Sequence, residues 1–151
     1  MDSEYGFGYS IFRTSLKKFI LDTSGAATIP VVFDRSLATP NLRDTRIDKW
    51  VVPVYGITRY TDYALQSELI VNVCTRQDPE WDKNTMLLEY YKSSFEKAYF
   101  HGSAPIPLLK EGEQIGCINV MSIDIQKGYD FEDQTKVTPM DITLWCPIAY
   151  K

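Results

Sequence analysis

The stretch Val137–Tyr150, VTPMDITLWCPIAY, decides the fold of this chain. Its apolar face carries Met140, Ile142, Leu144, Cys146 and Ile148. A period of two over this length predicts a long β-strand with one buried face. Pro139 and Pro147 fall on the other face, and because proline cannot donate to a ladder, they predict an edge strand or a bulged one. A long edge strand invites pairing with another chain, and a partner subunit is one way to cover it.

Three further stretches predict strands. Leu65–Arg76 and Gln114–Gln126 both place apolar residues on one face, and Trp50–Thr58 is a strand interrupted by Pro53. At about 3.3 Å per residue, a twelve-residue strand spans about 40 Å. This exceeds the usual strand length, and we infer that the sheet extends into an assembly.

Two segments predict amphipathic helices. Phe7–Asp22 places Phe12, Leu16 and Ile20 on one stripe, and Gly25 suits a left-handed C-cap position. The second helix opens at Asp78, a good N-cap followed by proline, and runs to about Phe100.

The elements follow one another in the order α-β-β-β-α-β-β, with a short strand at Ile29–Asp34 after the first helix. Ser103–Glu113 is expected to be a loop, and Lys127–Gln134 a polar connection to the final strand. This order predicts a two-layer α+β fold, a largely antiparallel sheet packed by two helices. The 151 residues fit one domain, 1–151.

Composition excludes several classes of protein. The net charge of −4 argues against binding nucleic acid by general electrostatics. Three dispersed cysteines, Cys74, Cys117 and Cys146, are typical of buried free thiols in a reducing compartment. The N-terminus lacks the apolar run of a signal peptide, and no stretch reaches the length of a membrane span, so no membrane partner is expected.

The sequence contains no convincing catalytic motif. His101 is the only histidine, so a serine or cysteine hydrolase would need it as the base. Carboxylates gather near the last hairpin at Asp124, Asp130, Glu132, Asp133 and Asp141. A divalent cation site or an acid–base pair there is conceivable, but their spacing matches no calcium loop, and a solvated hairpin tip explains them better. No catalytic residue, metal or cofactor is predicted.

Two groups of residues are candidates for a subunit interface. The segment Arg35–Lys49 has no clear period, and we interpret it either as a solvated loop or as an arm that contacts a neighbouring subunit. Aromatic and arginine side chains flank the turn predicted at Arg59–Tyr63. Such residues are typical anchors of protein interfaces, but they are equally expected to cover the end of the local core. The candidate interface residues are Arg35, Arg43, Arg46, Trp50, Tyr55, Arg59, Tyr60 and Tyr63.

The order and lengths of the elements resemble the tail-terminator, or tail-completion, proteins of long-tailed bacteriophages. The resemblance rests on the helix Phe7–Asp22 leading into Ile29–Asp34, on the strand pair that follows, on the run Gln66–Trp81 from strand to capped helix, and on the final hairpin Gln114–Tyr150. It covers nearly the whole chain, and no single motif in it is diagnostic.

The resemblance implies a structural virion protein with no catalytic residues. Such proteins form a hexameric ring at the head-proximal end of the tail tube, end tube polymerisation and join the head connector. The implied partners are further copies of the chain, the tail tube protein, the connector or neck proteins and, in a contractile tail, the sheath protein. Genomic DNA would only pass through the lumen, and the implied location is the virion, after assembly in the host cytoplasm. The alternatives are another neck or head-completion adaptor, or a small α+β ligand-binding or enzymatic module.

Overall fold

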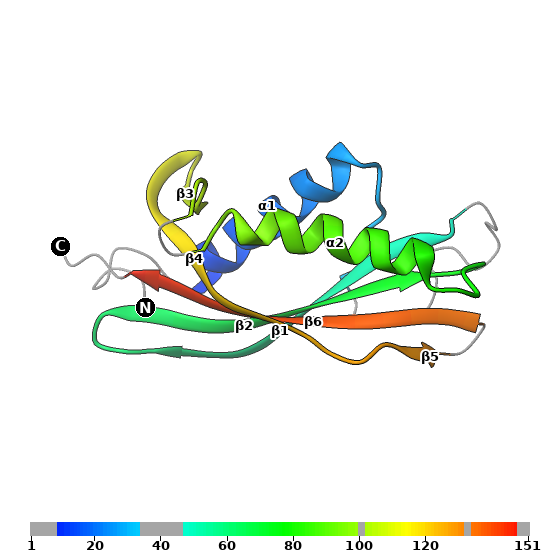
Figure 1. Cartoon of the computed structure of the whole chain (residues 1–151). Coiled ribbons are helices and arrows are strands. Elements are labelled where there is room, and N and C mark those ends of the chain that lie inside the picture. The colour runs from blue at the N-terminus through cyan, green and yellow to red at the C-terminus, as the bar shows by residue number, and fades with distance from the viewer. Residues whose placement is uncertain (1–8, 34–46, 100–101, 132–133, 148–151) are drawn as a thin grey trace.

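A computed structural model describes residues 9–33, 47–99, 102–131 and 134–147 of the chain. It has two layers, a twisted antiparallel sheet and two helices that lie on the same face of it (Figure 1). The α+β fold class predicted from the sequence is confirmed. The described helices include none that is long and apolar enough to cross a membrane.

The sheet is built around long strands. Its order is β1 (Lys49–Tyr60), β2 (Ala64–Thr75), β6 (Thr135–Pro147), β4 (Glu113–Ile125) and β3 (Ile106–Lys110). A short strand, β5 (Tyr129–Phe131), pairs with β6 beyond the end of β4. The great length predicted for β2, β4 and β6 is therefore confirmed.

The final strand, β6, is central in the sheet, so the expectation of an edge strand was wrong. It pairs with β2 from Ala64↔Pro147 to Thr75↔Lys136, and with β4 and β5 on its other side. Pro139 lies at the gap where β4 has ended and β5 has not begun, and its carbonyl accepts a hydrogen bond from the Gln126 amide at 2.9 Å. Because Pro139 faces this gap, its lack of an N–H costs the ladder no hydrogen bond. Pro147 is the last residue of the strand.

The first helix, α1 (Tyr9–Ala26), buries the predicted stripe of Phe12, Leu16 and Ile20. It passes through Gly25 and ends at Ala26, and the left-handed residue after it is Thr28, at φ 56°. The Ile29 amide then donates to the Ser24 carbonyl at 2.9 Å. The prediction of Gly25 as a left-handed C-cap was therefore wrong. Gly25 lies inside the helix, and the left-handed residue is Thr28, three positions later.

The second helix, α2 (Asp82–Glu96), begins later than predicted, and its N-cap residue is Trp81, which makes no side-chain capping bond, so the prediction of Asp78 as the N-cap was wrong. The Asp78 carboxylate accepts the amides of Lys83, at 3.0 Å, and Asn84, at 2.8 Å, and the Thr75 hydroxyl. Burial raises the pKa of Asp78, but these hydrogen bonds outweigh it and leave the pKa below its usual value.

Asn84, in the first turn of α2, fastens the helix to the two central strands. Its amide nitrogen donates to the carbonyls of Val73 in β2 and Lys136 in β6, at 3.1 and 3.2 Å. Its oxygen accepts the Thr138 hydroxyl at 2.6 Å. Buried polar groups that are fully bonded in this way fix one arrangement of helix on sheet.

The core has two parts, one on each face of the sheet. The larger part lies between the sheet and the helices and includes Leu69, Tyr91, Phe95 and Ile142. The smaller part lies on the opposite face and consists of Trp50, Val52, Cys74 and Val137, with Val32, Ile47, Val54 and Phe131 packed against it.

Three segments differ from the sequence-based expectation. The predicted strand Ile29–Asp34 makes only an isolated parallel bridge, Val31↔Val51, and its last residue lies outside the described part of the chain. Strands β3 and β5 occupy segments predicted as a loop and a connection. Both are short, five and three residues, so neither shows a clear period.

Candidate functional site

The outer edge of β1 is the leading candidate for a functional surface. The hydrogen bonds Val51 N to Pro30 O, at 3.0 Å, and Val32 N to Val51 O, at 2.9 Å, show that Val51 directs its backbone groups outward. Strand alternation then places the backbone groups of Pro53 and Tyr55 on the same outward side. Within the described residues, no backbone partner covers these two positions.

A bulge in β1 extends this open edge. The register with β2 shifts between Tyr55 and Thr58, so the outward side passes from odd to even residues and Thr58 faces outward. Ile57, inside the bulge, is 80% exposed. Gly56 passes so close to Glu68 of β2 that a Cβ on the glycine would lie 2.5 Å from the carboxylate oxygen. The stretch Pro53–Thr58 is called the β1 edge below.

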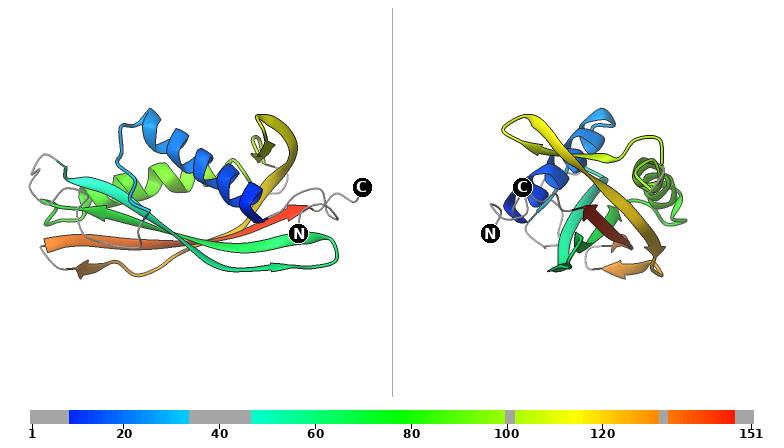
Figure 2. Two further views of the ribbon diagram at one scale, coloured as in Figure 1. Left: turned by 180° about the vertical axis from the view of Figure 1, so that it is seen from behind. Right: turned by 90° about the vertical axis from the view of Figure 1, so that its left-hand side faces the viewer.

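On the other side of the sheet, the outer edge of β3 is covered. Ser15 of α1 donates to the Leu109 carbonyl at 3.4 Å and accepts the Leu109 amide at 2.9 Å, so it occupies the outer edge of β3. Proteins commonly protect edge strands in this way. Figure 2, in its right-hand view, shows β1 on one side of the sheet and the descending part of β4 on the other.

The interface residues predicted from the sequence divide into three groups. Arg35, Arg43 and Arg46 lie outside the described residues. Trp50 is fully buried in the smaller core, which corrects the expectation that it contacts a neighbouring subunit. Its side chain points to the face away from the helices, where the apolar cluster around Val137 covers it.

The tyrosines and Arg59 are distributed along the β1–β2 hairpin. Tyr55 and Tyr60 pack against the main core, in agreement with the alternative prediction that such residues cover the end of the local core. The Arg13 guanidinium lies 4.2 Å from the centre of the Tyr55 ring. Tyr63 is 76% exposed at the turn, and Arg59 is exposed and donates to Gln66 at 3.2 Å. Figure 1 shows this hairpin extending past the helices.

The face of the sheet away from the helices carries a row of carboxylates next to the β1 edge. Glu68 of β2, Asp141 of β6 and Asp124 of β4 lie on this face, and Asp124 is directly opposite Asp141. A hydrogen bond with Asp141, together with burial and the nearby negative charge, raises the pKa of Glu68. Directly opposed like charges destabilise a sheet, so this row is not explained by stability.

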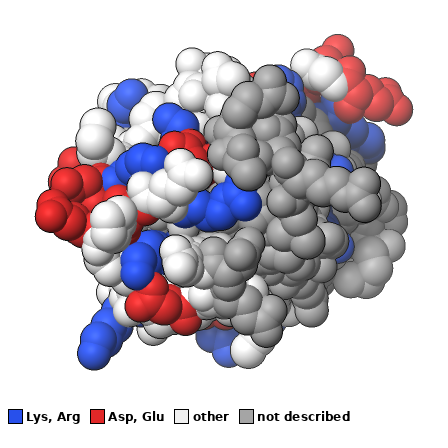
Figure 3. All heavy atoms as spheres, turned by 90° about the vertical axis from the view of Figure 1, so that its right-hand side faces the viewer, with Lys and Arg blue, Asp and Glu red and all other residues white. Residues whose placement is uncertain are grey.

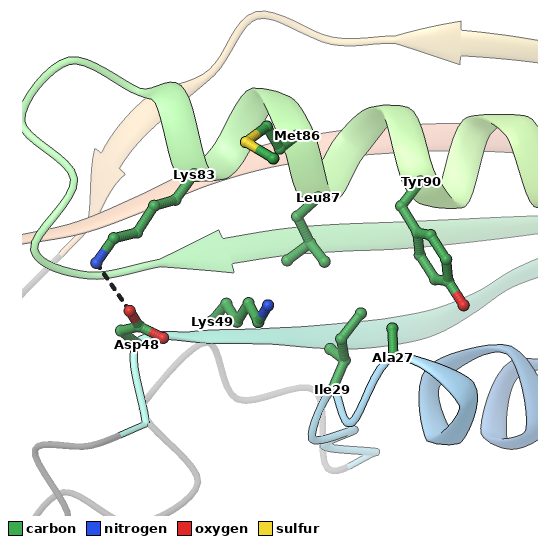
Figure 4. A pocket seen from close by; sticks show the side chains of 8 residues that line it. All are labelled: Ala27, Ile29, Asp48, Lys49, Lys83, Met86, Leu87 and Tyr90. Atoms are coloured by element: carbon green, nitrogen blue, oxygen red, sulfur yellow. Dashed lines mark hydrogen bonds and ion pairs between the residues drawn. The ribbon is translucent and has the colours of Figure 1, made fainter.

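A second feature is a groove at the opposite end of the molecule from the hairpin. It has a volume of about 420 Å³ and lies between α2, the end of α1 and the start of β1 (Figure 4). Its lining residues are Ala27, Ile29, Asp48, Lys49, Lys83, Met86, Leu87 and Tyr90. Asp48 and Lys83 form an ion pair of 2.8 Å at one end, and Met86 is 73% exposed.

Charge at that end of the molecule is mixed. Figure 3 shows acidic and basic side chains interspersed over the coloured part of this surface. A strong field of one sign, which would attract a polyelectrolyte, is not visible on the residues drawn in colour.

The residues considered for chemistry are dispersed. His101 lies outside the described residues, as do Glu132 and Asp133 of the predicted carboxylate cluster. Asp130 pairs with Lys136 at the β5–β6 hairpin. The described residues hold no group of three or more histidine, cysteine or acidic side chains placed to bind a metal ion. The three cysteines are free thiols, and burial raises the pKa of both Cys74 and Cys146 to about 12.

Comparison with known proteins gives a likeness of fold only. No model of a known protein family matches the sequence, and no curated protein matches it. One solved structure, whose name describes no function, is similar over 95% of this chain and 97% of its own, with a TM-score of 0.62 and 13% sequence identity. The fold therefore occurs in another protein of similar extent, and this likeness carries no information on activity.

Proposed function

We propose that this chain is a structural virion protein of the bacteriophage neck or tail that assembles into a ring at the head-proximal end of the tail tube. In this role it ends tube polymerisation and joins the tail to the head connector. Its partners are copies of itself, in a hexamer if the family resemblance holds, the tail tube protein and the connector proteins, and the sheath protein if the tail is contractile.

The observation that carries the proposal is the β1 edge, which has no partner within the described chain. An open strand edge beside an exposed isoleucine is a template for pairing with another chain, and soluble monomers usually block such edges. Ser15 blocks the edge of β3, whereas the described residues provide no backbone partner for Pro53, Tyr55 and Thr58 on the β1 edge. Selective protection of one edge is expected of a chain that pairs through the other.

The carboxylate row supports the same proposal. If the face away from the helices lines the ring, Glu68, Asp141 and Asp124 would repel the phosphates of DNA passing through. A lumen of this kind would let the genome pass without binding it, consistent with the net charge of −4.

The test is the assembly state of the purified chain, alone and with isolated tail tubes. Light scattering and negative-stain imaging are expected to show rings in solution or at tube tips, and tubes capped by the protein should stop growing. A strict monomer that neither binds nor caps tubes would refute the proposal.

The groove in Figure 4 favours a second candidate, a small ligand-binding module. Its volume is within the range of small-molecule sites, and its lining combines apolar and charged groups. A thermal-shift screen with metabolites distinguishes the two: a monomer stabilised by a metabolite, with Met86→Lys abolishing the shift, would favour this candidate.

A further inference from the structure

Within the described residues, the sheet has a second uncovered edge, on β4. Strand β3 pairs with β4 only as far as Ile106↔Ile118, and Ala98, after α2, accepts the Val120 amide at 2.8 Å. Beyond that point, β4 continues from Met121 to Ile125 with β6 on one side and no described strand on the other. This stretch is called the β4 edge below.

The direction of the backbone groups on the β4 edge follows from the register. Ser122 and Asp124 pair with β6, and the Gln126 amide donates to the carbonyl of Pro139, which also lies in β6. Alternation therefore turns the backbone groups of Ile123 and Ile125 outward, where the described residues provide no partner. Met121 and Ile125 are 52% and 44% exposed, so this edge is also apolar.

The two edges match in direction. The four long strands β1, β2, β6 and β4 are antiparallel at every step, so β1 and β4 run in opposite directions. When copies are related by rotation about an axis along the strands, β4 of one copy lies antiparallel to β1 of the next. An even number of alternating strands thus lets the ladder continue across the contact without a break.

From these observations we propose that the β1 edge pairs with the β4 edge of a second copy, antiparallel and head to tail. This inference rests on the proposed function and names the contact by which the ring forms. The contact is heterologous, so each copy pairs through its β1 edge with one neighbour and through its β4 edge with the other. A two-fold contact between two β1 edges, the competing arrangement, would leave the β4 edge unused.

Proline substitutions test the contact, because proline removes one outward N–H and leaves the internal ladder intact. Pro53 already occupies such a position in β1. The variants are Thr58→Pro on the β1 edge and Ile125→Pro on the β4 edge. The matched controls, Thr58→Val and Ile125→Val, keep the N–H, and the valine at 58 also accounts for loss of the hydroxyl contact with Ser67.

We expect each proline variant to weaken self-association at least about tenfold in sedimentation velocity, while both valine controls assemble as the wild type does. Mixing the two proline variants is expected to yield one-to-one pairs, because each retains the edge that the other lacks. If circular dichroism shows that a proline variant is unfolded, Ile57→Lys and Ile125→Lys replace the pair, with Leu21→Lys on the exposed side of α1 as the control.

Two results would overturn the inference while leaving the proposed function in place. One is an Ile125→Pro variant that assembles like Ile125→Val. The other is a mixture that stays monomeric while the wild type forms rings. A wild type that never assembles, even on tail tubes, would instead refute the proposed function.

Discussion

Replacement of Asn84 by alanine tests how the helical layer is held to the sheet. The side chain is buried and makes hydrogen bonds to Val73, Lys136 and Thr138, which tie α2 to both central strands. At about 1 kcal/mol net for each bond, the loss is about 3 kcal/mol of the free energy of unfolding. For a chain of this size, this corresponds to a fall in Tm of about 6–12 °C.

Urea unfolding followed by circular dichroism measures this loss, with the free energy extrapolated to zero denaturant. The matched control is Glu89→Ala on the exposed side of the same helix, which is expected to change stability by less than about 0.5 kcal/mol. A loss below about 1 kcal/mol for Asn84→Ala, with an unchanged dependence on urea, would show that the buried network does not hold the two layers together.

Four other predictions follow from the described contacts. Because the folded pKa of Asp78 is lowered, its contribution is present above the unfolded value of about 3.9 and is lost as pH falls through the folded pKa. Asp78→Asn is therefore expected to flatten the acid side of the stability curve, and an unchanged curve would contradict this. Because the folded pKa of Glu68 is raised, its contribution is present below the unfolded pKa and is lost as pH rises through the folded one. Glu68→Gln should accordingly raise Tm at pH 7, whereas Glu89→Gln should not. Gly56→Ala is expected to destabilise by about 1 kcal/mol through contact with Glu68, and the double variant with Glu68→Ala should recover most of this; additive losses would argue against the contact. Ellman's reagent is expected to label Cys117 in the folded protein but Cys74 and Cys146 only after unfolding, and rapid labelling of all three would contradict their burial.

The fold class was predictable because long alternating strands and two apolar helical stripes leave few ways to build a core. The position of β6 was not predictable. The prolines show where a ladder bond is missing, but they do not distinguish an outer edge from a gap between two neighbouring strands. Strand β3 was missed because Pro105 and Pro107 favour a loop reading, although Ile106 and Leu108 are buried in the main core.

The candidate site was only partly predictable from the sequence. Aromatic residues near the β1–β2 turn drew attention to the hairpin, but residue type alone did not separate exposed Tyr63 from buried Trp50. Ile57, Met121 and Ile125 were missed because their exposure depends on two β-bulges and on the end of β3, which are set by pairing between distant strands. The open edges are properties of the sheet order and leave no local pattern in the sequence.

Hydrogen exchange in the assembled protein tests most directly whether another copy completes the sheet. The amides of Tyr55 and Thr58 point outward from β1 and have no backbone partner among the described residues, so in a single copy they are expected to exchange faster than the paired amides of the sheet. In the assembled particle they are expected to be protected as strongly as the amides that pair β2 with β6. Fast exchange of these two amides in a particle of confirmed ring size would contradict pairing through the β1 edge.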